Sequence, residues 1–338
     1  MILDLKTVED SKGPRDSKEL IYDQIIEDLT FAEEHLPLRS EYSASDEGRI
    51  NKGAAKILFG KVYLTKGDFQ KAKDKLAEVV EHESEYGFGL HKDYHANWLR
   101  DTEAGIEAVL YIEYKEPPFQ HNGEMALAGP KYSIPGSLGI SALNEADIPT
   151  QELYDQFDNR DLRKKTNFKT EFAHLKTGEI LKSSIPLSGK FWVEGLETGD
   201  RCDVNMHIIR YADAILMYAE ALNEVGESTK ALAMLNRIRE RAFGDDSGNF
   251  KPMSKDEFRT AILNERRLEF PHEGHRWFDL VRTGTFIQRM KEHSAYEAKV
   301  AEANKTEIAQ NIKEHMILMP IPQSEIDLNP NLVQNAGY

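Results

Sequence analysis

One segment, residues 51–82, constrains the fold more than any other part of the chain: NKGAAKILFGKVYLTKGDFQKAKDKLAEVVEH. Its apolar residues recur at helical spacing on both sides of a turn at Lys66–Asp68, so it predicts two helices joined by that turn. Small residues at Gly60 and Ala72 let the helices approach closely. Larger side chains fill the seam: Phe59, Tyr63, Phe69, Leu76 and Val79.

A second segment, residues 210–242, has the same organisation: RYADAILMYAEALNEVGESTKALAMLNRIRERA. Gly226 lies in its turn, with apolar residues at matching positions on both sides: Tyr218, Leu222, Ala231, Leu235 and Ile238. Both segments have the spacing of a tetratricopeptide repeat. Because they are far apart in the sequence, they do not form a simple tandem array.

Two further helices are predicted, one over Asp16–Leu36 and one over Ser254–Leu268. The second begins at an S-x-x-E capping signal, Ser254 with Glu257, and its apolar residues are expected to be buried: Phe258, Ile262, Leu263 and Leu268. The sequence therefore predicts a mostly α-helical fold. We treat residues 1–338 as a single domain.

Charge and cysteine content exclude several classes of protein. The net charge of −15 repels nucleic acid, so no nucleic-acid partner is expected. The single cysteine, Cys202, excludes an intramolecular disulfide and any site with several cysteine ligands. No apolar run of about 18 residues is present, so no segment is expected to span a bilayer.

The region between the two helix pairs, residues 84–205, differs in composition. Aromatic residues, glycine and proline become more frequent, and short candidate strands such as AVLYIEY (108–114) lie among long loops. A long irregular insertion in a helical protein is where binding function tends to lie. The C-terminal residues 315–338, rich in proline and asparagine, are expected to pack against the body as an extended tail.

The stretch NERRLEFPHEGHRWFDLVRTG, residues 264–284, has the composition of a possible active or metal site. His272 and His275 do not have the H-E-x-x-H spacing that places two metal ligands on one helical face, so a structural role is favoured for them. Glu265 and Glu269 lie four residues apart, a spacing that places both carboxylates on one helical face, so a glycosidase pair is the alternative interpretation. Neighbouring arginines at 266, 267 and 276 are expected to hold both carboxylates ionised, which favours a buried ion-pair network over a proton donor.

This stretch resembles the C-terminal signature of the SusD/RagB family, with matches at Glu265, Arg266, Arg267, Glu269, Glu273, Gly274, Arg276, Trp277, Asp279, Leu280 and Arg282. Other segments agree in the expected order: ELIYDQIIEDLTFAEEHLP, GRINKGAAKILFGKVYLTKGDFQKA, PTQELYDQFDNRDLR, RYADAILMYAEALNE and MPIPQSEIDLNPNLVQNAGY. The resemblance spans nearly the whole chain. It implies that the signature is structural, with internal Arg–Glu pairs and Trp277 wedged into the core.

The resemblance also implies a function. Members of this family are nutrient-binding lipoproteins of the outer-membrane cell surface, which capture an oligosaccharide, or in some members a peptide, and pass it to a SusC-like TonB-dependent transporter. Members usually begin with a lipoprotein signal peptide, a lipidated cysteine and further helices. The sequence shows none of these at its start, and Cys202 is not placed to be the anchor.

Sugar rings stack their apolar CH faces on aromatic side chains, while their hydroxyls bind polar groups. The insertion offers candidates of both kinds: Tyr94, Asn97, Trp98, Tyr114, Phe119, Gln120, Asn122, Tyr132, Phe191 and Trp192. For each aromatic residue, a buried anchor that holds a loop on the helices remains the alternative. Trp98 and Trp192 are the strongest candidates, because a fully buried indole needs a hydrogen-bond partner.

Three functional hypotheses remain open at this stage. The favoured one is a non-catalytic binding protein without a cofactor. A second is a tetratricopeptide-type adaptor that grips a protein partner along its groove. A third, a hydrolase, needs two carboxylates at a defined separation in a loop pocket, and the sequence shows no such pair. Calcium binding at Asp245 and Asp246 is less favoured than a solvated turn, because the spacing lacks an EF-hand pattern.

Overall fold

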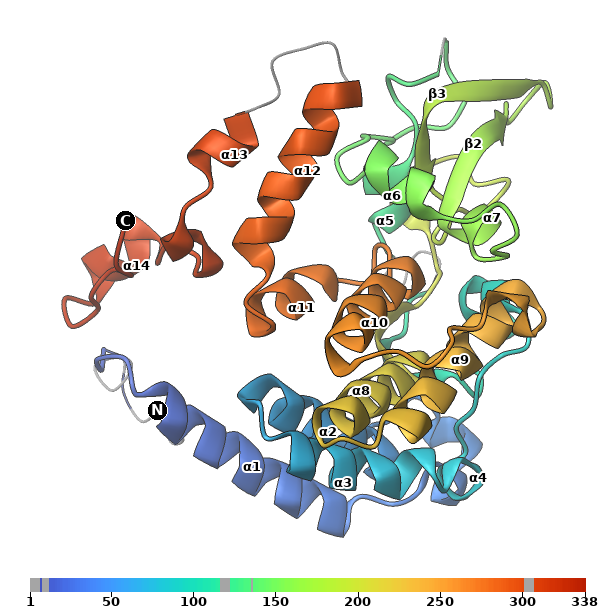
Figure 1. Ribbon diagram of the computed structural model, residues 1–338. Helices are drawn as coiled ribbons and strands as arrows, with labels where there is room; N and C mark the ends of the chain where they lie inside the picture. The colour runs from blue at the N-terminus through green and yellow to red at the C-terminus, as the bar shows by residue number, and fades with distance from the viewer. Residues whose placement is uncertain (1–6, 8–11, 116–121, 135, 301–306) are drawn as a thin grey trace. The chain divides into compact units, whose positions relative to one another are not determined.

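The computed structural model describes residue 7 and residues 12–115, 122–134, 136–300 and 307–338 (Figure 1). The chain divides into two compact units. The larger unit is His35–Arg276, and the smaller unit combines Met1–Glu34 with Trp277–Tyr338. The predicted Phe119 and Gln120 lie outside the described residues.

The first helix pair is formed by α2 (Lys52–Lys66) and α3 (Phe69–Val80) in the larger unit. Asn51 caps α2 by accepting a hydrogen bond from the backbone N–H of Ala54, and Gly67 ends it in the left-handed conformation, φ 78°. Asp68 then caps α3 through the backbone N–H of Lys71. The predicted pair and its turn are confirmed.

The second pair is formed by α8 (Tyr211–Glu224) and α9 (Ser228–Phe243), with Gly226 in the turn at φ 89°. Helix α8 is buried on nearly all sides, since it packs on α9, α3, α2 and α10 (Lys255–Glu269). The contact between α3 and α8 makes the two pairs neighbours in space, although more than a hundred residues separate them in sequence (Figure 1).

Helix α10 begins as predicted, with a full capping box between Ser254 and Glu257. Its buried side differs from the prediction. Phe258 and Ile262 are buried, but Leu263 and Leu268 are only half-buried. Glu265 and Glu269 occupy the inward positions instead, because basic residues from other elements surround them there.

The insertion carries two small antiparallel sheets. Strand β1 (Ala108–Ile112), part of the predicted segment, pairs with β4 (Met206–Arg210), and the register joins Ala108 to Arg210 and Ile112 to Met206. Strand β2 (Phe168–Ala173) pairs with β3 (Ile180–Ser188). The short helix α4 (Glu83–Tyr86) precedes β1, and three more lie between β1 and β2: α5 (Glu124–Ala128), α6 (Gln151–Gln156) and α7 (Lys164–Asn167). Strand β4 follows the insertion directly, so the β1–β4 pair joins the first part of the insertion to the chain that enters α8.

The smaller unit contains α1 (Lys18–His35), α11 (Arg276–Arg282), α12 (Phe286–Val300), α13 (Glu307–Asn311) and α14 (Gln323–Leu328). The C-terminal tail, expected to be extended, includes α14 and a 3-10 turn at Glu314–Ile317. Trp277 is only half-buried, and its ring contacts that of Phe286 at 4.6 Å. Across the described residues, no helix combines the length and apolar character needed to cross a bilayer.

Candidate functional site

A buried network of charges lies where the insertion meets the helices. Glu269 of α10 accepts from three arginines: Arg210 and Arg241 bind its Oε1 at 2.9 and 2.5 Å, and Arg163 binds its Oε2 at 2.9 Å. Burial raises the pKa of Glu269, but Arg241, Arg210 and Arg163 together lower it to about 2. Glu269 is therefore ionised at neutral pH and cannot act as a proton donor.

The network extends to both sides of Glu269. Glu273 contacts Lys190 Nζ at 2.5 Å and Arg210 Nε at 2.6 Å, and burial lowers the pKa of Lys190 to about 8. Acidic and basic side chains are balanced, five of each: Asp161, Glu107, Glu265, Glu269, Glu273, Arg163, Arg210, Arg239, Arg241 and Lys190. The predicted buried ion-pair network at Glu265 and Glu269 is confirmed.

The partners of these carboxylates differ from the prediction. Arg266 instead pairs with Asp213 on α8 at 2.6 Å, and Arg267 pairs with Glu152 at 3.1 Å. Residues one or two apart on a helix point in different directions, so Glu265 meets arginines from α9 and the insertion rather than its sequence neighbours. The signature holds α8, α9, α10 and the insertion together.

The two histidines of the signature are structurally engaged. His272 Nδ1 lies 3.2 Å from Asp147 Oδ2, and His275 Nδ1 lies 3.7 Å from Asp213 Oδ2. Burial lowers the pKa of His275 to about 4. Within the described ranges, no group of three or more His, Cys, Asp or Glu side chains is arranged to hold a metal ion.

Three of the predicted ligand residues, Tyr94, Asn97 and Trp98, lie together on a buried 3-10 helix, Tyr94–Trp98. The Tyr94 hydroxyl donates to the Glu269 carbonyl at 2.6 Å, and Asn167 Oδ1 lies 3.0 Å from the same hydroxyl oxygen. Asn97 Nδ2 donates to the Tyr94 carbonyl at 3.1 Å. In this conformation the Tyr94 hydroxyl and the Asn97 Nδ2 bind the protein itself, as the loop-anchor alternative requires.

Trp98 is 4% exposed and has no free ring face. Lys190 Nζ lies 4.6 Å and the Arg210 guanidinium 5.3 Å from its ring centre, so the indole borders the charge network as a cation–π partner. Its N–H finds no acceptor among the described residues. The indole N–H of Trp98 is therefore buried without the hydrogen-bond acceptor that was expected for it.

Trp192 and Tyr114 are half-buried. The Trp192 ring packs edge-on against Phe172 of β2 at 4.7 Å. Tyr114 follows β1, where its backbone N–H donates to Asn205 Oδ1 at 2.9 Å. Asn122 is buried and binds the Val204 carbonyl, and Phe191 is buried beside Cys202, whose pKa burial raises to about 11.

Among the predicted aromatic residues that the structure describes, Tyr132 is the exposed one, with 73% of its surface accessible. The loop that carries it, residues 131–133, is fixed by hydrogen bonds to a single carboxylate oxygen. Glu145 Oε1 accepts from the backbone N–H groups of Lys131, Tyr132 and Ser133 at 2.7, 3.0 and 2.8 Å, and from the Ser133 hydroxyl at 2.5 Å. The ring is therefore presented to solvent on a fixed backbone.

The backbone around this loop is strained. Among the described residues, three that are not glycine have a positive φ: Ala142 at 59°, Glu145 at 53° and His272 at 59°. His272 contacts Asp147, two residues beyond Glu145, so all three belong to one neighbourhood. Strain of this kind clusters at ligand-binding sites, where surrounding contacts maintain it.

Glu145 was not singled out by the sequence analysis. An isolated glutamate in a loop carries no motif, and its role depends on a left-handed backbone and on N–H groups twelve to fourteen residues away. Sequence reasoning thus found the aromatic ring but missed the residue that positions it.

Comparisons with known proteins agree with this architecture. The SusD family model matches residues 189–338. The SusD-like protein P2 of Formosa agariphila is 30% identical over 362 residues, which cover 97% of this chain and 66% of that protein. The chain thus spans just under two thirds of the length of this curated relative.

Solved structures give the same result. A SusD superfamily protein from Parabacteroides distasonis is similar with a TM-score of 0.77 and 26% identity, over 96% of this chain and 70% of that one. A laminarin-binding SusD-like protein is similar with a TM-score of 0.75 and 25% identity, over 100% and 73% of the two chains. The family model, the curated relative and the solved structures agree, and the chain belongs to the SusD family.

Proposed function

We propose that this protein binds a glycan at the insertion and that Tyr132 is a stacking platform for a sugar ring. The observation that carries the proposal is the exposed Tyr132 ring on a backbone clamped by Glu145. An aromatic ring that is fixed before the ligand arrives loses little conformational entropy on binding. Apolar CH faces of a pyranose stack on such a ring.

Polar groups beside Tyr132 suit the hydroxyls of the same ligand. Lys131 precedes it, with its Nζ 5.1 Å from the Tyr132 ring centre, and exposed Asn144 precedes Glu145. The backbone N–H of Asn144 donates to the Ala126 carbonyl at 2.8 Å, which ties the 142–147 segment to α5. A structurally similar family member described as laminarin-binding supports a polysaccharide fragment as the ligand class.

Buried Tyr94, Asn97 and Trp98 are not accessible to a ligand in this conformation, and half-buried Trp192 and Tyr114 remain candidates for contact with a longer ligand. No proton transfer is required, because capture needs shape, stacking and hydrogen bonds alone. In the intact cell-surface protein, the bound glycan would pass to a partner TonB-dependent transporter, as the family resemblance implies.

Isothermal titration calorimetry tests the glycan site. The chain is titrated with laminarin oligosaccharides and then with other soluble polysaccharide fragments. Tyr132→Ala is expected to weaken binding at least tenfold, with circular dichroism unchanged. Phe278→Ala removes a similarly exposed ring, 67% accessible, from the smaller unit and serves as the matched control. Binding that survives Tyr132→Ala at full strength, or binding of peptides alone, would overturn the proposal.

A further inference from the structure

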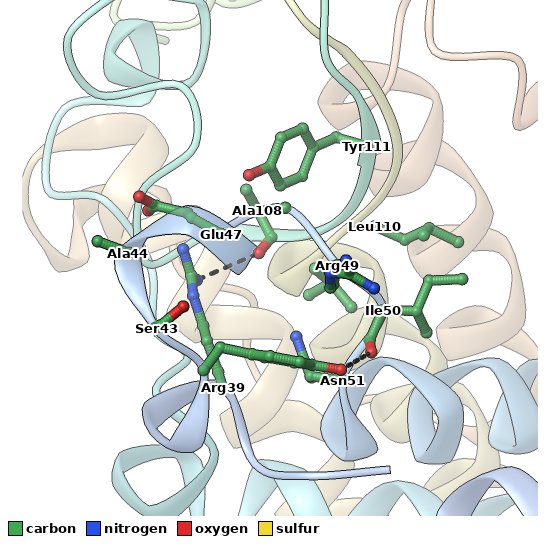
Figure 2. Close-up of a pocket in the computed structure, with 13 residues that line it drawn as sticks. Arg39, Ser43, Ala44, Glu47, Arg49, Ile50, Asn51, Ala108, Leu110 and Tyr111 are labelled. Atoms are coloured by element: carbon green, nitrogen blue, oxygen red, sulfur yellow. Dashed lines mark hydrogen bonds between the residues drawn. The ribbon is translucent and has the colours of Figure 1, made fainter.

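A pocket of about 170 Å³ lies in the larger unit between the segment 39–51 and strand β1 (Figure 2). None of the residues singled out above as ligand-binding candidates lines it. Typical sites for drug-sized ligands have volumes of about 300–1,000 Å³, so this one is limited to a small molecule or the end of a larger one.

The walls of the pocket are fixed by internal hydrogen bonds. Arg39 donates to three backbone carbonyls, those of Ala104 at 2.6 Å, Gly105 at 2.9 Å and Ala108 at 3.3 Å. The Tyr42 hydroxyl donates to the Ile50 carbonyl at 2.7 Å. These bonds tie the segment before α2 to itself and to the chain entering β1, so the pocket is preorganised.

Several polar groups of the lining have unused hydrogen-bonding capacity. Asn51 is 5% exposed, and its Oδ1 accepts from the Ala54 N–H at 3.0 Å. Its Nδ2, the Tyr111 hydroxyl and the Glu47 carboxylate have no hydrogen-bond partner within the part of the chain that the structure describes. Arg39 has five N–H groups and uses three, so two remain.

The charges of the lining balance. Arg49 is paired with Asp46 at 2.8 Å, which leaves one cation, Arg39, and one anion, Glu47. A balanced lining favours an uncharged ligand over an anion or a cation. The free groups include donors and acceptors, a mixture that matches hydroxyls, because each hydroxyl both donates and accepts. The rings of Tyr42 and Tyr111 add apolar surface.

We propose that this pocket binds one neutral pyranose ring, either a free monosaccharide or the terminal unit of a glycan. In this arrangement Asn51 Nδ2 and Arg39 donate hydrogen bonds to the sugar hydroxyls, and Glu47 accepts one from them. The Tyr111 hydroxyl either donates or accepts. The proposal depends on the pocket alone, and Tyr132 is not required for it.

Two conservative variants test the pocket. Asn51→Asp replaces the free Nδ2 donor with an acceptor while keeping an oxygen to cap α2, and aspartate caps a helix as well as asparagine does. Tyr111→Phe removes the free hydroxyl and keeps the ring. Tyr63→Phe removes a tyrosine hydroxyl elsewhere, on α2, and is the matched control.

The readout is ligand-observed NMR with methyl glycosides of glucose, galactose, mannose and xylose, together with glucuronate and glucosamine. We expect millimolar binding of at least one neutral sugar. Asn51→Asp and Tyr111→Phe should weaken it at least fivefold, and Tyr63→Phe should leave it unchanged. If only oligosaccharides bind and Asn51→Asp weakens them, the ligand is the terminal unit.

Three results would overturn the pocket proposal: no neutral sugar binds in any form, binding is the same in both pocket variants, or a charged sugar binds more tightly than its neutral counterpart. Failure of the Tyr132 site appears differently, as oligosaccharide binding that is insensitive to Tyr132→Ala. The two proposals therefore fail independently.

Discussion

Arg210 and Glu269 face each other with no solvent-accessible side-chain surface, and Arg210 Nη1 lies 2.9 Å from Glu269 Oε1. Arg210 is the last residue of β4 and Glu269 the last of α10, so this pair joins the strand that follows the insertion to a helix of the scaffold. Because neither charge meets water, each depends on the other partners of the network.

Glu269→Gln should therefore destabilise the protein strongly. The substitution keeps the shape but leaves Arg163, Arg210 and Arg241 with too little negative charge in a buried site. Removing one partner of a buried ion pair typically costs about 3 to 5 kcal/mol. Urea denaturation followed by circular dichroism measures the loss. Asp256→Asn, at a pair exposed on the surface of α10, is the control and should change stability little. Equal effects of the two variants would contradict the structural role of the network.

The buried carboxylates of Glu269 and Glu273 predict that acid destabilises the fold. The pKa of Glu269 falls from about 4.5 to about 2 on folding, and that of Glu273 falls further. A carboxylate whose pKa is lower in the folded state stabilises the fold fully above pH 4.5, and this contribution is lost as the pH falls from 4.5 towards 2. The urea concentration at the unfolding midpoint, measured from pH 7 to pH 3, should decrease once the pH falls below 4.5. A midpoint that does not change over this range in the wild-type protein would contradict the lowered pKa values of Glu269 and Glu273. The Glu269→Gln variant should show a shallower drop.

Glu145→Ala tests whether the clamp, and not only the Tyr132 ring, matters for binding. The substitution leaves three backbone N–H groups and one hydroxyl without their acceptor, which frees the loop 131–133. Glycan affinity should fall although the ring is still present, since ordering the loop then opposes binding. Hydrogen exchange should become faster at the amides of Lys131, Tyr132 and Ser133. Faster exchange with unchanged affinity would show that preorganisation is unimportant.

Gly60→Ala tests the close approach of α2 and α3. A Cβ atom at this position would lie 2.5 Å from Leu76 Cγ, and Leu76 is fully buried. Overpacking should cost about 1 to 3 kcal/mol, although alanine is intrinsically the better helix former. In the double variant Gly60→Ala with Leu76→Ala, the new methyl group enters the space that leucine vacates. The combined loss should be smaller than the sum of the single losses, and an additive result would mean that the two residues do not meet.

Most of the helices could be predicted from local sequence signals. Asn51, Gly67 and Ser254 mark helix ends through interactions within a few residues, so sequence spacing locates α2, α3 and α10 to within one or two positions. The packing of α3 on α8 was not predicted, because it depends on how the long insertion returns to the scaffold. Periodicity also failed to predict that Glu265 and Glu269 would replace leucines on the buried side of α10.

The candidate site was predictable only in part. Composition located the aromatic residues of the insertion, but which rings are exposed depends on tertiary contacts. Trp98 is enclosed by Lys190 and Arg210, whereas Tyr132 is displayed by Glu145. The pocket at Arg39, Asn51 and Tyr111 combines a loop and a strand that no short motif connects.

The charge network also sets a rule for engineering binders from this scaffold. Glu107, Asp161, Arg163 and Lys190 come from the insertion, whereas Arg241, Glu269 and Glu273 come from α9, α10 and the turn after α10. A loop face grafted from a relative would therefore fit only if its donor supplies two acids and two bases at these four positions. A graft that supplied only part of this set would leave an unpaired charge inside the protein, however well its new surface recognised its target.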